Sequence, residues 1–127
     1  MTSYARGILL GIAATVALAG CAQPPHAITL ASGTQLMIII EKTDTYVDRH
    51  NAKKLMFSVG YQSHANFQDP NAIRDEMYAV FDYYKPAIDR GGYSKLTLTP
   101  MQRDLGGSWE GMPFYLERRP SGRWIIL

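Results

Sequence analysis

Residues 69 to 92 read DPNAIRDEMYAVFDYYKPAIDRGG, and this stretch decides the fold class that the sequence predicts. An aspartate followed by a proline is a typical helix start, because the carboxylate can cap free amides and proline suits the first helical position. Pro86 is expected to interrupt the helix, and Gly91 with Gly92 to end it. Large apolar residues recur three or four positions apart, which predicts one buried helical stripe made of Ile73, Met77, Val80, Phe81, Tyr84 and Ile88.

Short apolar segments on both sides of this helix predict strands. Residues 35–41 (QLMIIIE) form a continuous apolar run, which is typical of a strand covered on both faces, whereas residues 55–61 alternate with a period of two and indicate one buried face. The polar residues 42–53 between them are expected to form an irregular loop. After the helix, residues 94–99 alternate again and are expected to stop at Pro100.

A hairpin at the carboxyl end completes the predicted sheet. Residues 114–118 and 123–127 are expected to pair around the turn residues 120–122. The sequence therefore predicts an α+β domain, in which a small antiparallel sheet of about five strands has one long helix packed on one face. The glycine-rich residues 106–111 lack the lysine and the following helix of a phosphate-binding loop, and we expect a long hairpin loop there.

The amino-terminal residues have a different character. A short positive region, residues 1–6, precedes the apolar residues 7–19, a run that is shorter than the roughly 20 residues of a transmembrane helix. The run ends in Leu18-Ala19-Gly20-Cys21, which resembles the lipobox of bacterial prolipoproteins at every position. An ordinary secretory signal, cleaved after Ala19, is the alternative interpretation.

The lipobox resemblance implies a cleaved signal peptide over residues 1–20 and a lipidated cysteine at position 21. In such lipoproteins the thiol carries a diacylglycerol and the freed amine an acyl chain such as palmitate, and two or three chains give stable membrane attachment. The residue after the cysteine is Ala22 rather than aspartate, which implies the outer membrane with the domain on its periplasmic face. An inner-membrane or surface-exposed location stays open.

The remaining chain is expected to hold a tether and one domain. Residues 21–33, with two adjacent prolines, are predicted to form the lipidated cysteine and an extended tether, and residues 34–127 a single domain. An alternative interpretation pairs residues 28–30 with the next strand through Ser32 and Gly33, which would shorten the tether.

Composition and motifs argue against several function classes. Thirteen basic and eleven acidic residues give a net charge of +2, which provides no reason to expect nucleic acid as a partner. Cys21 is the only cysteine, so the chain cannot form an internal disulfide. The sequence contains no HExxH pair, no G-x-S-x-G elbow, no phosphate loop and no calcium loop, so we predict no cofactor and no metal site.

The titratable residues offer weak candidates for catalysis. His64 and Asp69 could in principle transfer a proton, but a surface histidine beside a helix cap is the preferred interpretation. Asp75 and Glu76 are expected in the first helical turn, where negative charge suits the helix dipole. The other two histidines fall in the expected tether and polar loop, at positions 26 and 50.

Two surface features are candidates for binding instead. Arg118, Arg119 and Arg123 flank one turn and form a basic cluster suited to lipid phosphates, lipopolysaccharide or an acidic partner. Charges on a terminal hairpin also protect against edge-to-edge aggregation, which is the competing interpretation. Aromatic side chains that could anchor a protein interface, or could instead share in the core, are Trp109, Tyr78 and Tyr83.

Three functions are therefore compatible with the sequence. The favoured one is a non-enzymatic envelope lipoprotein that binds another protein as an accessory, inhibitor or immunity-type factor. The second is a module that recognises cell-wall or lipid material through the basic hairpin, and the third is a small hydrolase that uses His64. The mature region resembles the many small lipoproteins of bacterial envelopes, without a residue-by-residue match to one family.

Overall fold

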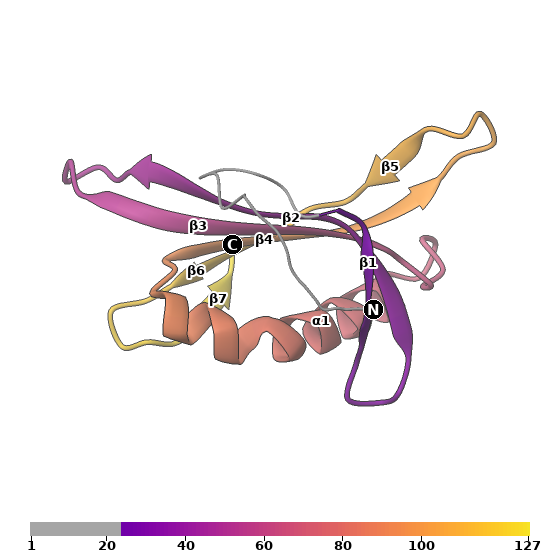
Figure 1. Ribbon diagram of the computed structural model, residues 1–127, viewed down its shortest axis with the longest axis horizontal. Helices are drawn as coiled ribbons and strands as arrows, with labels where there is room; N and C mark the ends of the chain where they lie inside the picture. Colours follow the sequence, from indigo (N-terminus) through magenta and orange to yellow (C-terminus); the bar gives the residue numbers. More distant parts are fainter. Residues whose placement is uncertain (1–23) are drawn as a thin grey trace, which may run out of the picture.

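The computed structural model describes residues 24–127 as one sheet with a single helix on one face (Figure 1). The signal-peptide interpretation, including Leu18, Ala19 and Gly20, and the lipidation of Cys21 lie outside the described residues. The elements follow the order β1 (His26–Thr29), β2 (Gln35–Val47), β3 (Lys53–Gln62), α1 (Pro70–Gly91), β4 (Lys95–Arg103), β5 (Trp109–Gly111), β6 (Phe114–Arg118) and β7 (Trp124–Ile126).

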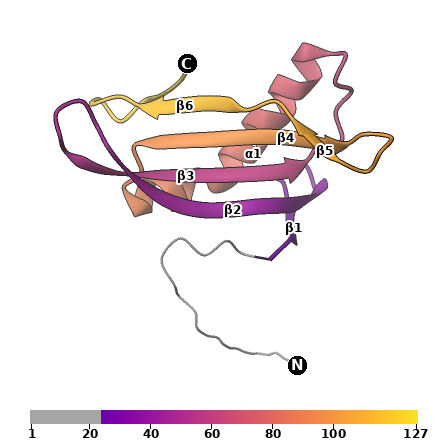
Figure 2. The same ribbon diagram turned by 90° about the horizontal axis from the view of Figure 1, so that it is seen from above.

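The α+β class is confirmed, but the sheet has seven strands rather than about five and is not purely antiparallel. Its order is β1-β2-β3-β4-β6-β7, with β5 paired to β4. The neighbours β3 and β4 are parallel, because α1 returns the chain to the starting end of the sheet before β4 begins. Figure 2 shows α1 crossing the strands obliquely on one face.

The predicted tether is too long, because β1 lies inside residues 21–33. The chain turns at Ser32 and Gly33 and pairs β1 with the start of β2 in an antiparallel hairpin. Ile28 and Leu30 are buried in the core. The alternative pairing of residues 28–30 is therefore the correct one, and the domain begins near His26.

The strands β2 and β3 are also longer than predicted. Residues 42–47 continue β2 and pair with β3, so that only residues 48–52 form the connecting turn. The polar composition of this segment misled the prediction, because this ribbon extends beyond the part of the sheet that the helix covers (Figure 1). The prediction that residues 35–41 are covered on both faces is wrong as well, since Met37 and Ile40 are exposed.

A β-bulge in β2 changes which side chains face the helix. Ile38 lies opposite Tyr61, but Ile40 lies opposite Gly60, so one extra residue is inserted in β2. Beyond the bulge, Glu41 pairs with the buried Val59 and shares its side of the sheet. Strict alternation from Ile38 would have turned Glu41 to the opposite face.

The helix agrees closely with its prediction. The Asp69 carboxylate accepts hydrogen bonds from the amides of Asn71 and Ala72, and Gly92 ends the helix in the left-handed region at φ 68°. Phe81 is the exception in the predicted stripe: it is half-buried at the edge of the core, where its ring meets Trp124 edge-on. The buried stripe consists of Ile73, Met77, Val80, Tyr84 and Ile88.

Two prolines do not break their elements as predicted. The helix continues through Pro86, which is exposed on the solvent side, so the Asp82 carbonyl that loses its donor can be hydrated. β4 continues through Pro100, whose missing N–H falls where the neighbour of β4 changes from β6 to β5.

The remaining turns differ little from expectation. Residues 104–108 form a tight turn, and Trp109–Gly111 form β5 instead of belonging to a loop. The β6–β7 hairpin forms as predicted. The β2–β3 and β4–β5 hairpins extend from opposite ends of the sheet (Figure 1). Within residues 24–127, no helix combines the length and the apolar character needed to span a bilayer.

Candidate functional site

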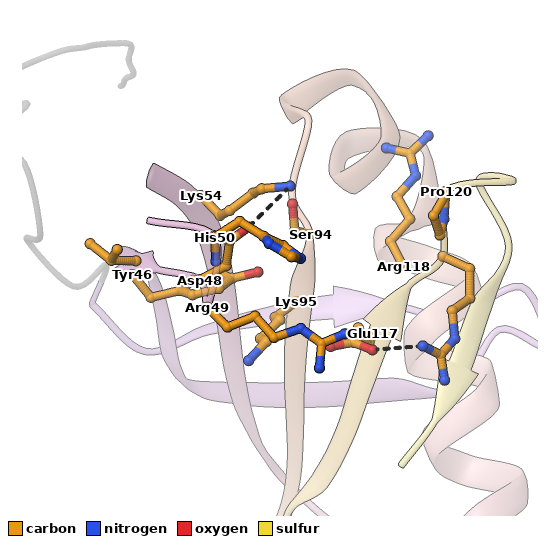
Figure 3. A pocket seen from close by; sticks show the side chains of 12 residues that line it. Tyr46, Asp48, Arg49, His50, Lys54, Ser94, Lys95, Glu117, Arg118 and Pro120 are labelled. Carbon is orange, nitrogen blue, oxygen red and sulfur yellow. Dashed lines mark hydrogen bonds and ion pairs between the residues drawn. The ribbon is translucent and has the colours of Figure 1, made fainter. Parts of the chain in front are cut away.

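An open cleft of about 620 Å³ lies at the end of the sheet that carries the β2–β3 hairpin. Twelve residues line it, from the β2–β3 hairpin, the start of β4 and the end of β6 (Figure 3). We call it the basic cleft. Its titratable side chains, apart from Tyr46, are Asp48, Arg49, His50, Lys54, Lys95, Glu117, Arg118 and Arg119.

The cleft results from a step in the sheet. The pairing of β3 with β4 starts at Met56 and Lys95, so the first residues of β3 and the last of β2 extend beyond the start of β4. On the other side, the amide of Arg118 donates to the Ser94 carbonyl at 2.9 Å and holds the end of β6 against the start of β4. Side chains from three separate segments therefore converge on one hollow.

Asp48 organises the turn at one wall of the cleft. One of its carboxylate oxygens accepts hydrogen bonds from the amides of His50 at 2.8 Å and Ala52 at 2.9 Å. The hydrogen bond from the Ala52 amide is the main cause that lowers the pKa of Asp48 below its usual value. Lys54 Nζ lies 3.7 Å from the other oxygen, so Asp48 and Lys54 form an ion pair and largely neutralise each other.

The other charges of the cleft leave positive groups without a counter-ion. Arg119 forms an ion pair with Glu117 at 3.2 Å. Within residues 24–127, Arg49, Lys95 and Arg118 have no carboxylate within ion-pair distance. Five cationic side chains against two carboxylates give the lining a formal excess of three positive charges.

The three unpaired cations approach the cleft from different directions. Figure 3 shows Arg49 directed toward Glu117, whereas Arg118 extends away from Arg49. The Lys95 ammonium lies over the ring of Tyr46, 4.6 Å from its centroid, in a cation–π contact. The strand register also places Lys95 and Arg118 on opposite faces of the sheet, so the three cations border the cleft from different sides rather than meeting at one point.

The structure divides the predicted binding residues. Arg118 and Arg119 line the basic cleft, whereas Arg123 lies outside its lining. Trp109 lies on β5, at the other end of the sheet, where Arg103 stacks over its ring at 4.6 Å. The sequence prediction missed the cations that complete the cleft, Arg49, Lys54 and Lys95, because they are far from residue 118 in the chain and no local pattern links them.

The exposed aromatic residues also separate. Tyr78 and Tyr83 are each 45% exposed, so the core interpretation is wrong for both. Trp109 is half-buried.

The structure does not pair the weak catalytic candidates. His64 is exposed, and no hydrogen bond joins its side chain to Asp69, which caps the helix. Asp75 and Glu76 both lie beyond the first helical turn, contrary to the prediction, and Glu76 accepts hydrogen bonds from the Ser63 hydroxyl and the His64 amide. These contacts tie the chain after β3 to α1. In residues 24–127, no group of three or more histidine, cysteine or acidic side chains is placed to hold a metal ion.

Comparison with protein-family models, with curated proteins and with solved structures finds no match for this chain.

Proposed function

We propose that the chain is a lipid-anchored bacterial envelope protein whose non-enzymatic domain binds an acidic segment of another envelope protein in the basic cleft. The observation that carries this function is the set of three cations, Arg49, Lys95 and Arg118, that line one cleft with no carboxylate within ion-pair distance among residues 24–127. Arginine suits such a partner because its guanidinium can donate two parallel hydrogen bonds to one carboxylate.

The position of the cleft favours a protein over the lipid headgroups of the anchoring leaflet. β1 pairs with the start of β2, whereas the cleft lies at the far end of β2 and β3 (Figure 1). The chain from Cys21 to His26 reaches at most about 18 Å. Lys54 and Tyr61 of β3 are about 23 Å apart at the usual rise per residue. A lipid on Cys21 would therefore keep the end of the domain that carries β1 closest to the membrane, and the basic cleft farther from it.

A pair of charge-matched variants tests the cleft. Arg49, Lys95 and Arg118 are replaced together by glutamine, and the control replaces three exposed cations outside the cleft, Lys53, Arg74 and Arg123. The full chain in a non-ionic detergent is titrated with a glutamate-rich peptide at low and high salt. We expect the cleft variant to lose about tenfold in affinity with a weaker salt dependence, and the control to lose less than about twofold.

Equal losses in the two variants would contradict a specific cleft, because net charge alone would then explain binding. A water-soluble headgroup analogue, glycerophosphoglycerol, provides the second arm of the test, because the anchor of a lipidated chain would insert into any vesicle. Binding of this analogue that depends on the cleft cations, without binding to the peptide, would replace the protein partner by anionic lipid.

Membrane attachment is tested separately with Cys21→Ser. Cells that express the unchanged chain should incorporate a fatty-acid analogue into it, because the thiol is the acceptor of the first lipid, and the protein should fractionate with membranes. The variant should lose the label and accumulate as uncleaved precursor. Persistent labelling of the variant would contradict the lipid anchor and leave the cleft experiment unaffected.

A further inference from the structure

A second pocket, of about 430 Å³, lies between the second half of α1 and the helix side of β2 and β3. Its volume is within the range of about 300–1,000 Å³ typical of small-molecule sites. We call it the aromatic pocket, because four rings line it, those of Phe57, Tyr83, Tyr84 and Tyr93. None of these residues lines the basic cleft.

The rings hold one another in place. The Phe57 centroid lies 5.5 Å from that of Tyr84 and 5.2 Å from that of Tyr93, and Tyr83 meets Tyr84 edge-on at 5.0 Å. The Tyr93 hydroxyl is in a hydrogen bond of 2.8 Å with the Thr43 hydroxyl, which links the helix end to β2. The walls of the pocket are therefore preorganised.

Glu41 adds a carboxylate to this aromatic lining. The β-bulge places it on the helix side of the sheet, and only 19% of its side chain is exposed. One oxygen lies 3.0 Å from His26 Nε2 and accepts a long hydrogen bond of 3.4 Å from the Tyr84 hydroxyl. Burial, with the nearby Glu41 carboxylate, raises the pKa of Tyr84 well above its usual value, so this hydroxyl stays a donor.

The negative charge of Glu41 lacks a permanent counter-ion. Among residues 24–127, no lysine or arginine lies within ion-pair distance of it, and His26 supplies a charge only when protonated. A largely desolvated carboxylate is unfavourable without a cationic partner. Aromatic rings beside such a carboxylate are the groups that bind ammonium ions bearing alkyl substituents.

We infer that the aromatic pocket binds a small organic cation with a substituted ammonium group, which lies among the four rings and opposes Glu41. This site is independent of the basic cleft and of membrane attachment. Tyr83 both lines the pocket and is 45% exposed, which places it at the pocket mouth. Arg90 also lines the pocket, and its positive charge should weaken the binding of a cation there, so that removing this charge should increase the affinity.

Choline and its neutral carbon analogue test the ligand class. The analogue has the same shape, with a carbon atom in place of the quaternary nitrogen. The full chain in a maltoside detergent is titrated with each compound, and binding is followed by saturation-transfer NMR of the methyl signals. We expect choline to bind at least about fivefold more tightly than the analogue, because cation–π contacts and Glu41 recognise charge. Equal binding of the two compounds would overturn the inference.

Four variants test where choline binds and how the charges around the pocket change its affinity. Glu41→Gln should weaken choline binding about tenfold, whereas Arg90→Ala should tighten it about twofold. Tyr83→Ala should weaken binding, and Tyr78→Ala serves as the matched control, because the two tyrosines are equally exposed on α1 and only Tyr83 lines the pocket. Weaker binding in Arg90→Ala, or equal losses in the two tyrosine variants, would contradict the assignment. Both tyrosines are at the surface, so their replacement leaves the fold available for the comparison.

Soluble headgroup analogues distinguish the source of the ammonium group, because the anchor of a lipidated chain would insert into any vesicle. Tighter binding of glycerophosphocholine than of choline, lost in Glu41→Gln, would identify a lipid headgroup, whereas binding of choline alone would identify a free molecule. Absence of binding in both arms would overturn the inference without affecting the basic cleft.

Discussion

The basic cleft and the aromatic pocket are two hollows of opposite character in one small domain. The cleft is lined by charged side chains, exposed or half-buried, from turns and strand ends, whereas the pocket is built from rings packed between the helix and the sheet. The positive lining of the cleft fits an anion, and the carboxylate of the pocket fits a cation. The difference follows from position, because the cleft lies at one end of the sheet whereas the pocket shares its walls with the core.

The largest expected effect separates the two regions by stability. Tyr84 is buried and belongs to both the core and the aromatic pocket. Tyr84→Ala should lower the free energy of unfolding by about 3–5 kcal/mol, as expected for truncation of a buried aromatic residue. Glutamine at Arg49, Lys95 and Arg118 together should change it by less than about 1 kcal/mol, because surface substitutions have small effects. Chemical denaturation of the full chain in detergent measures both values.

Comparable losses in these two variants would break the distinction, since the cleft cations would then be part of the folded core. Phe81→Ala provides an intermediate reference for the loss in the free energy of unfolding. Its ring is half-buried, so its loss should fall between the two.

A smaller effect concerns alkaline pH. Tyr84 has a raised pKa in the folded protein, so above about pH 10 the unfolded chain releases a proton that the folded chain keeps. Stability is therefore full below about pH 10 and should fall as the pH rises further, by up to about 1.4 kcal/mol per pH unit for this tyrosine. Tyr84→Phe should fall less steeply, as followed by denaturation at a series of alkaline pH values.

Parallel slopes for Tyr84→Phe and the unchanged chain would contradict the burial of this hydroxyl against Glu41. The buried Tyr61 also has a raised pKa, caused by burial and by Glu76, so some alkaline sensitivity should remain in the variant. The triple glutamine variant of the cleft serves as the control and should keep the slope of the unchanged chain.

Local patterns predicted the helix better than any other element. The Asp69 cap, the apolar stripe and the terminal glycines all act within one segment, and they agree with the structure except for Phe81, which is half-buried, and Pro86, which does not interrupt the helix. The strand cores of β3, β4 and β6 were also predictable from alternation. The polar end of β2 was missed because its local signal is weak, and the short β1 behind two prolines was predicted only as an alternative to a tether.

The candidate sites were predictable only in part. The arginines at 118 and 119 stand out in the sequence because they are adjacent, but Arg49 and Lys95 join them only through the step between β3 and β4. The aromatic pocket had no sequence signal beyond Tyr83, because Glu41 faces the helix only as a result of the bulge. A one-residue insertion in a strand reverses the facing of every later side chain, and the composition does not record it.

The sequence by itself therefore determined the α+β class, the helix with its cap and buried stripe, and the alternation of the central strands, because these depend on contacts between residues close in the chain. Only the tertiary structure decided the parallel pairing of β3 with β4, the orientation of Glu41, and the meeting of Arg49 with Arg118 at one cleft. Those features depend on how distant segments pack together, and packing between segments is set by the whole core rather than by any local pattern.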